Sequence, residues 1–169
     1  MKTLLADYQA KSSNSLSFEL TQGAESIGKL TYKNWFHFTA TLELANHSTY
    51  QLIPKGFWHS TIELKEADRV LLKFSMNWNG SIALKTYFND MENEYLLKHR
   101  GVFNESFLLI DQEETELLIM KPHVKWINLN YEYQIQASDR FESLSNKELL
   151  LLTSIHCANY YMSMMAGTY

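Results

Sequence analysis

The segment that decides the fold is the C-terminal stretch SNKELLLLTSIHCANYYMSMMAGTY, Ser145–Tyr169, in which no charged side chain follows Glu148. Ser145 and Glu148 have the spacing of a capping box, which predicts a helix from Asn146 to about residue 165. The consecutive leucines Leu149–Leu152 point in different directions, at about 100° per residue, and leave no polar face in the first turns. Because a helix on a protein surface carries a charged face, we expect this helix to be surrounded on every side.

Either a bilayer or the protein itself could surround such a helix. The uncharged length is close to that of a membrane anchor. However, His156 and Asn159 are unfavourable at membrane depth, and no basic flank precedes the segment. We therefore expect the chain's own strands to enclose the helix, and we do not expect an integral membrane protein.

Alternation of apolar and polar residues dominates the chain from residue 16 to residue 136, as is typical of strands with one buried face. In RVLLKFSM, for example, Val70, Leu72, Phe74 and Met76 share a face. Short polar clusters such as KEAD, NWNG, NDMEN and DQEET separate these runs and suit hairpin turns. No linker interrupts the pattern, so we predict one mainly β domain over residues 1–169, with strands at about 16–136 and the helix at about 146–165.

The order of these features resembles a known superfamily. Strands joined by acidic turns (LLIDQEETELLIM), an aromatic-containing strand after each, and a closing uncharged helix are similar to the LURP-one-related, tubby C-terminal-like and phospholipid scramblase proteins. The resemblance runs from about Leu16 to the end of the chain. It implies a closed antiparallel barrel of about twelve strands enclosing a hydrophobic C-terminal helix, and a function linked to lipids.

Three departures accompany the resemblance. The turn at Asp111 lacks the glycine that such turns often carry, and the cysteine cluster that is lipid-modified in scramblases is absent. The acidic calcium loop of scramblases and the basic phosphoinositide site of tubby proteins match no particular positions here. The resemblance therefore implies a fold more strongly than it implies a ligand.

Composition narrows the possible partners and location. A formal net charge of −4 argues against a general nucleic-acid binder, which relies on many Lys and Arg. The single cysteine, Cys157, precludes an intrachain disulfide, and Asp7 interrupts the short apolar run near the start before it reaches the length of a signal peptide. We expect a cytoplasmic protein, with peripheral association at a membrane as a further option.

Motifs for catalysis, metals or cofactors do not stand out. The sequence has no G-x-S-x-G elbow, no P-loop and no dinucleotide fingerprint, and its histidines lack metal-ligand spacing. His156 and Cys157 are adjacent, which on a helix prevents them from pairing with each other. We predict no catalytic residue, metal or cofactor, while an enzyme whose residues converge only in three dimensions stays an alternative.

Two groups of polar residues are candidate sites. One is an interior strip on the helix, which either lines a small pocket or forms ordinary buried hydrogen bonds. The other is a basic group on the outer face of strands, which either meets an anionic headgroup or only keeps a strand soluble. The strip consists of Thr153, His156, Asn159 and Ser163, and the basic group of Lys98, Arg100, Lys121, His123 and Lys125.

The function predicted from these residues is that of a non-enzymatic binding or interaction module. Its candidate partners are an anionic membrane lipid or another protein. One alternative is a helix-grip carrier, in which a curved sheet and the same helix hold a small hydrophobic ligand. The other is the enzyme with a site not visible in sequence.

Overall fold

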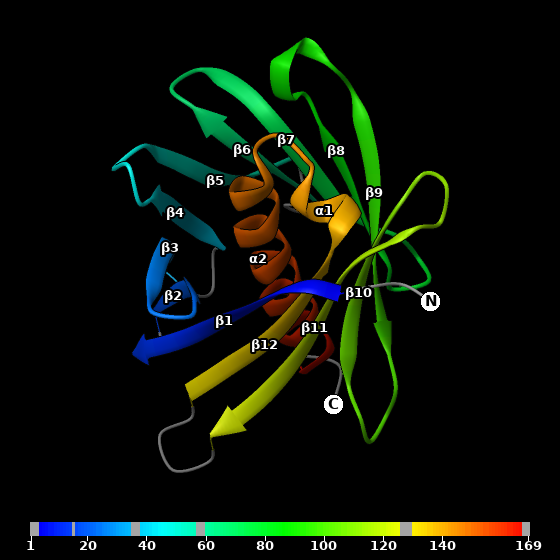
Figure 1. Cartoon of the computed structure of the whole chain (residues 1–169). Coiled ribbons are helices and arrows are strands. Elements are labelled where there is room, and N and C mark those ends of the chain that lie inside the picture. The colour runs from blue at the N-terminus through cyan, green and yellow to red at the C-terminus, as the bar shows by residue number, and fades with distance from the viewer. Residues whose placement is uncertain (1–3, 15, 35–37, 57–59, 126–129, 167–169) are drawn as a thin grey trace.

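The computed structural model describes residues 4–14, 16–34, 38–56, 60–125 and 130–166. Its strands form one closed antiparallel barrel, in which each strand pairs with the next in sequence and β12 pairs with β1 (Figure 1). The predicted barrel of about twelve strands is thus confirmed. The strands are β1 (Leu4–Asn14), β2 (Ser17–Gln22), β3 (Glu25–Asn34), β4 (Thr39–Leu44), β5 (Thr49–Lys55), β6 (Thr61–Glu66), β7 (Arg69–Met76), β8 (Ile82–Thr86), β9 (Asn93–Arg100), β10 (Ser106–Asp111), β11 (Glu116–Lys125) and β12 (Asn130–Ser138).

The strands form as their alternating pattern predicts. In β8, Ile82, Leu84 and Thr86 are buried while the residues between them are not, and Leu84 pairs with the buried Phe74 of β7. The first strand lies outside the predicted range, which began at residue 16. Inward positions of β1 include the small Ala10, which gives a weak hydrophobic signal beside polar neighbours. The barrel therefore starts earlier than the alternation indicated.

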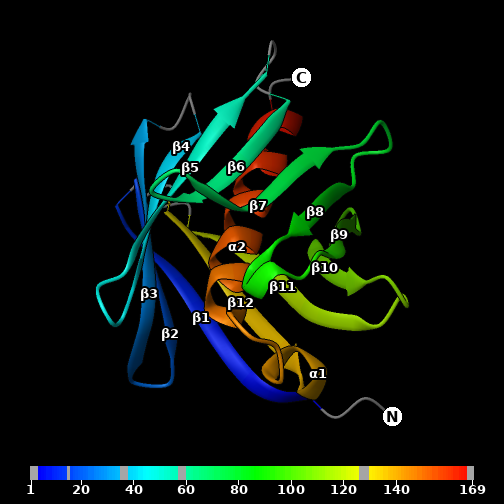
Figure 2. The same cartoon turned by 90° about the horizontal axis from the view of Figure 1, so that it is seen from above.

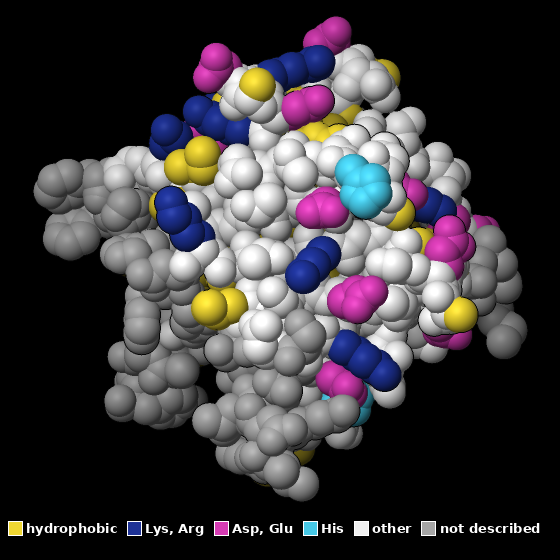
Figure 3. All heavy atoms as spheres, turned by 90° about the vertical axis from the view of Figure 1, so that its left-hand side faces the viewer, with side chains coloured by type: hydrophobic (Ala, Val, Ile, Leu, Met, Phe, Trp, Pro, Cys, Tyr) yellow, Lys and Arg dark blue, Asp and Glu magenta, His cyan; other side chains and the backbone are white. Residues whose placement is uncertain are grey.

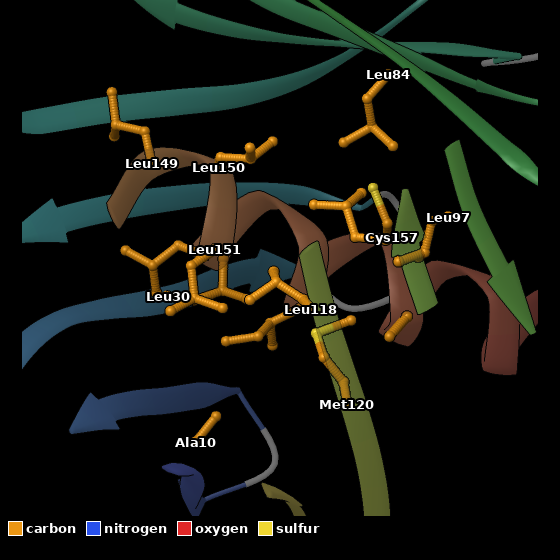
Figure 4. Close-up of a cluster of buried hydrophobic side chains, with 14 of the residues drawn as sticks. Ala10, Leu30, Leu84, Leu97, Leu118, Met120, Leu149, Leu150, Leu151 and Cys157 are labelled. Atoms are coloured by element: carbon orange, nitrogen blue, oxygen red, sulfur yellow. The ribbon is translucent and has the colours of Figure 1, made fainter. Parts of the chain in front are cut away.

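The C-terminal helix α2 (Lys147–Ala166) runs through the middle of the barrel (Figures 1 and 2). Every residue from 149 to 160 is buried, including those on opposite sides of the helix. Figure 4 shows Leu151 directed towards Leu30 of β3 and Leu118 of β11, while Cys157 lies near Leu97 of β9. The prediction that strands surround this helix is confirmed.

The start of α2 differs from the predicted capping box. Asn146, rather than Ser145, precedes the first helical residue, and its carbonyl oxygen accepts from Leu150 N at 3.2 Å. Asn146 has a φ of 58°, a left-handed conformation that Asn tolerates better than most residues. This turn carries the chain from the short helix α1 (Asp139–Glu142) into the barrel, so the helix begins one residue later than predicted.

Antiparallel order gives the barrel two distinct ends. Turns after odd-numbered strands lie at one end, where α2 also finishes: the Tyr161 ring stacks on His99, near the end of β9, with centroids 4.7 Å apart. We call this the Trp78 end; the described residues of its turns are Leu16, Phe38, Gly56, Ser60, 77–81 and 101–105. The opposite end, which we call the α1 end, holds α1, the 3-10 helix η2 (Phe88–Asp90) and the turns after even-numbered strands (Figure 2).

No helix in the described part of the chain has the length and apolar character needed to span a membrane.

Candidate functional site

The predicted interior strip meets two tyrosines of the barrel wall. Tyr32 of β3 and Tyr133 of β12 are buried, as are His156 and Asn159 of α2. Tyr133 Oη donates to Asn159 Oδ1 at 2.6 Å, and Asn159 Nδ2 donates to Tyr32 Oη at 2.9 Å. Tyr32 Oη also lies 2.7 Å from His156 Nδ1. This chain of hydrogen bonds ties α2 to two separate strands and fixes the rotation of the helix inside the barrel.

The hydrogen bonds also assign the protonation of His156. Because Tyr32 Oη accepts from Asn159, its own proton is available for His156 Nδ1, which therefore acts as acceptor in a neutral ring. Burial lowers the pKa of His156 to about 3. Burial also raises the pKa of the Cys157 thiol well above its usual value. Neither side chain titrates near pH 7, as a general base or thiolate nucleophile would.

Aromatic rings fill the space around His156. Its ring stacks on Tyr32 at a centroid distance of 5.3 Å and meets the edges of Phe74 at 5.6 Å and Phe38 at 6.3 Å. Thr153 is also fully buried, whereas Ser163, nearer the Trp78 end, is only partly buried. In the described structure, Thr153 Oγ1 and His156 Nε2 have no hydrogen-bond partner. Thr153, His156 and Asn159 therefore lie inside the packed core, and Ser163 lies at its edge.

Tyr32 and Tyr133 were missed by sequence reasoning. Both occupy inward positions of strands, where an apolar ring is expected and the hydroxyl is easily overlooked. A buried tyrosine hydroxyl nearly always finds a partner, so the polar strip on the helix was the signal that could have found them.

The predicted basic residues lie on the outer face of β9 and β11, the two strands on either side of β10. Arg100 of β9 pairs with Ser106 of β10, and Phe107 pairs with Met120 of β11, so Lys121 lies on the other side of Ser106 from Arg100. Two strand spacings, about 10 Å in total, separate these cations. The basic patch is defined as Lys98, Arg100, Lys121 and His123, of which Lys98 is half-buried and the others are exposed. The side chain of Lys125, also predicted here, lies outside the described residues.

Two other groups of charged residues on the barrel have neighbours of opposite sign. Across β1 to β4, one row reads Lys11, Glu19, Lys29 and Glu43. Figure 3 shows basic and acidic side chains interspersed over this side of the molecule. Lys85 forms ion pairs with Glu92 and Glu94 at 3.3 and 3.4 Å. By contrast, Lys98, Arg100 and Lys121 form no ion pair with any residue that the structure describes.

Two surface depressions flank the basic patch. Lys121 lines one of about 430 Å³, together with the neutral polar side chains of Gln134, Gln9 and Thr21 from the same cross-strand row. Asp7 is the one acidic residue of this lining. Lys98 lines the other, of about 570 Å³, whose lining combines the apolar Leu96 and Ile110 with the charged Lys85, Glu94 and Asp111. The patch thus lies beside hydrogen-bonding groups on one side and beside a surface of mixed apolar and charged residues on the other.

We also searched the described residues for groups of side chains that could bind a metal ion. Within the described ranges, no three His, Cys, Asp or Glu side chains gather closely enough to hold a metal ion.

Comparisons of the chain with protein-family models, with curated proteins and with solved structures gave no match. The resemblance to the tubby-like and scramblase superfamily therefore stays a prediction from the sequence pattern.

Proposed function

We propose that this protein is a non-enzymatic binding module that docks on anionic lipid headgroups through the basic patch. The observation that carries the proposal is the pair of exposed cations, Arg100 and Lys121, on either side of the uncharged Ser106. A basic residue near an anionic membrane contributes about 1 kcal/mol, so the patch supplies an attraction of a few kcal/mol.

The surroundings of the patch support a headgroup as ligand. Gln134 and Gln9 lie in the same row as Lys121, and their amides can donate hydrogen bonds to phosphate or carboxylate oxygens. The whole chain has a net charge of −4, so the attraction is local to the patch and is screened as salt rises. A cytoplasmic, membrane-peripheral location fits this proposal, because anionic lipids are concentrated in the cytoplasmic leaflet.

The two alternatives have less support. A helix-grip carrier needs interior space for its ligand, whereas α2 is buried from residue 149 to residue 160 and occupies the middle of the barrel. An enzyme needs a group that exchanges protons or attacks at neutral pH, whereas burial lowers the pKa of His156 and raises that of Cys157.

The test is co-flotation of the protein with phosphatidylcholine vesicles and with vesicles that also contain about one-third phosphatidylserine. We expect binding only to the anionic vesicles and a loss of binding at high salt. The double variant Arg100→Gln, Lys121→Gln removes about 2 kcal/mol of attraction and should bind about thirtyfold more weakly.

A charge-matched control separates this patch from net charge. Lys11→Gln, Lys29→Gln removes the same two charges from the alternating row on β1 and β3. This control should float almost as well as the unaltered protein. Absence of binding by the unaltered protein, or equal losses in the two double variants, would refute the proposal.

A further inference from the structure

Exposed apolar side chains are concentrated at one end of the barrel. Among the described residues, five of the six large hydrophobic side chains that are exposed lie at the Trp78 end, and the sixth, Met91, lies at the α1 end. The five are Leu16, Trp78, Val102, Phe103 and Met164. The other tryptophans, Trp35, Trp58 and Trp126, lie outside the described residues.

Ordered turns present the most exposed of these side chains. In the β7–β8 turn, Ser81 N donates to Asn79 Oδ1 at 3.1 Å and Asn77 Nδ2 donates to Ser81 Oγ at 3.1 Å. Trp78 is fully exposed at the tip of this turn. These hydrogen bonds fix the turn without using the indole ring, which is left facing solvent.

The β9–β10 turn is built in a comparable way. Gly101 has a φ of 84°, and a Cβ at this position would clash with the Asn104 carbonyl oxygen, so the turn requires glycine. The next residues, Val102 and Phe103, are 84% and 99% exposed. Arg100 of the basic patch directly precedes this turn, so a cation and an exposed aromatic ring share one hairpin.

Charge is distributed oppositely along the same axis. The described turns at the Trp78 end contain one acidic residue, Glu105, which lies 3.7 Å from the His99 ring. The turns at the α1 end, together with α1, contain seven acidic residues: Asp68, Asp90, Glu92, Glu113, Glu114, Asp139 and Glu142. Four of the seven form ion pairs with Arg69, Lys85, Arg140 or Lys147, which leaves an excess of three negative charges at this end. The excess of negative charge at the α1 end makes the Trp78 end the more favourable of the two for contact with an anionic surface.

We propose that the Trp78 end inserts its apolar tips, which are the side chains of Trp78 and Phe103, into the interfacial layer of an anionic membrane. The axis of α2 is then directed towards the bilayer. The inference rests on the proposed function and adds the orientation and depth of docking. Trp78 and Phe103 enter the layer between headgroups and acyl chains, where aromatic side chains are favoured. Arg100 then lies at headgroup level, next to the inserted hairpin.

A lipid surface suits these tips better than a folded partner. Trp78 and Phe103 stand on separate hairpins, β7–β8 and β9–β10. A protein interface would need a matching pocket for each ring. A fluid bilayer interface accepts separate side chains without such pockets, and the exposed Arg100 and Lys121 complement its charge.

Insertion can be measured with a fluorescent label at each end. Phe103→Cys and Met91→Cys are labelled with an environment-sensitive fluorophore, and the protein without a new cysteine is the labelling control because Cys157 is buried. On phosphatidylcholine and phosphatidylserine vesicles carrying acyl-chain quenchers, we expect a blue shift and quenching at position 103. The label at position 91 should keep its spectrum in water.

Removal of the tips gives an independent measurement. Trp78→Ser, Phe103→Ser should weaken vesicle binding by at least about tenfold at moderate salt, because two partly buried rings are lost. Met91→Ser, which removes an exposed apolar side chain at the other end, should leave binding unchanged. Both variants should retain the barrel, as checked by circular dichroism.

The two proposals fail in distinguishable ways. If the unaltered protein does not float with anionic vesicles, the proposed function fails and the insertion fails with it. If the protein floats but the label at position 103 is neither shifted nor quenched, or the tip variant binds fully, only the insertion is overturned. A shift at position 91 instead would reverse the orientation and also overturn the inference.

Discussion

Large apolar side chains are found in two different environments in this molecule, the buried core and the exposed Trp78 end. Inside the barrel, Leu149–Leu152 are buried on every side of α2 and pack against strands. At the Trp78 end, Trp78 and Phe103 are fully exposed although their chemistry is equally apolar. The difference indicates that the core is complete without the tips, so the barrel gains no stability from them. The exposed rings are therefore available for a partner, and the predictions below test this separation.

The largest effect should come from a charge placed in the core. Leu151→Asp introduces an unpaired carboxylate at a buried position, which costs more than the typical net stability of about 5–15 kcal/mol can absorb. We expect insoluble or unfolded protein, judged by soluble yield and circular dichroism. Met164→Asp, on the same helix but 45% exposed, is the control and should fold. A soluble, folded Leu151→Asp protein would show that the interior is not closed.

The second largest effect should be a loss of folding stability at low pH, because His156 is buried in its neutral form. The pKa of His156 is about 3 in the folded protein and about 6.5 when unfolded, so below pH 6.5 the unfolded chain binds a proton that the folded one does not. Stability should therefore fall by about 1.4 kcal/mol per pH unit between pH 6 and pH 3, or about 3 kcal/mol by pH 4.5.

Urea unfolding at several pH values measures this slope, and His156→Gln is the control because glutamine stays neutral. The variant should lose the part of the slope that belongs to His156. An unchanged slope in the variant would mean that His156 is already accessible to protons in the folded state.

Loss of the amide in the polar cluster should have a smaller effect. Asn159→Leu removes the acceptor of Tyr133 Oη and a donor to Tyr32 Oη, at a cost of about 2 kcal/mol. Chemical denaturation measures the loss. If Asn159→Leu is as stable as the unaltered protein, the hydrogen bonds do not contribute to holding α2 in place.

The smallest effect on stability should come from the exposed tips. Phe103→Ser removes a side chain that is 99% exposed, so its free energy of unfolding should change by less than about 0.5 kcal/mol. Thermal unfolding checks this value beside the vesicle-binding experiment. A large loss of stability would mean that the tip belongs to the core, and the distinction between the two regions would disappear.

The interior could be predicted from the sequence because its signal is local. A helix whose first turns contain Leu149–Leu152 has no face for water, and alternation in segments such as β8 shows which side of a strand meets it. The strand β1 was missed because Ala10 contributes little hydrophobic contrast. The start of α2 was misplaced because the chain reverses at Asn146 through a left-handed turn that the Ser145 spacing does not show.

The grouping of surface residues was harder to predict from the sequence, because it depends on how distant strands pair. The sequence indicates Arg100 and Lys121 as two separate basic residues, and only the register through Ser106 shows that they flank one residue. The grouping of Trp78 with Phe103 depends on the number of strands between them, since one missed strand would move a turn to the opposite end. The sequence therefore predicted members of the patch, but it did not predict that exposed apolar side chains gather at one end of the barrel.

The pairing of β1 with β12 has a consequence for biosynthesis. One edge of β1 has no partner until residues 130–138 leave the ribosome, and α2 emerges later still. The strands of the barrel are thus synthesised before the helix that fills it. A nascent chain lacking residues 147–166 exposes the apolar inner face of those strands. Productive folding waits for the last helix, and until then this chain is the kind of intermediate that chaperones bind.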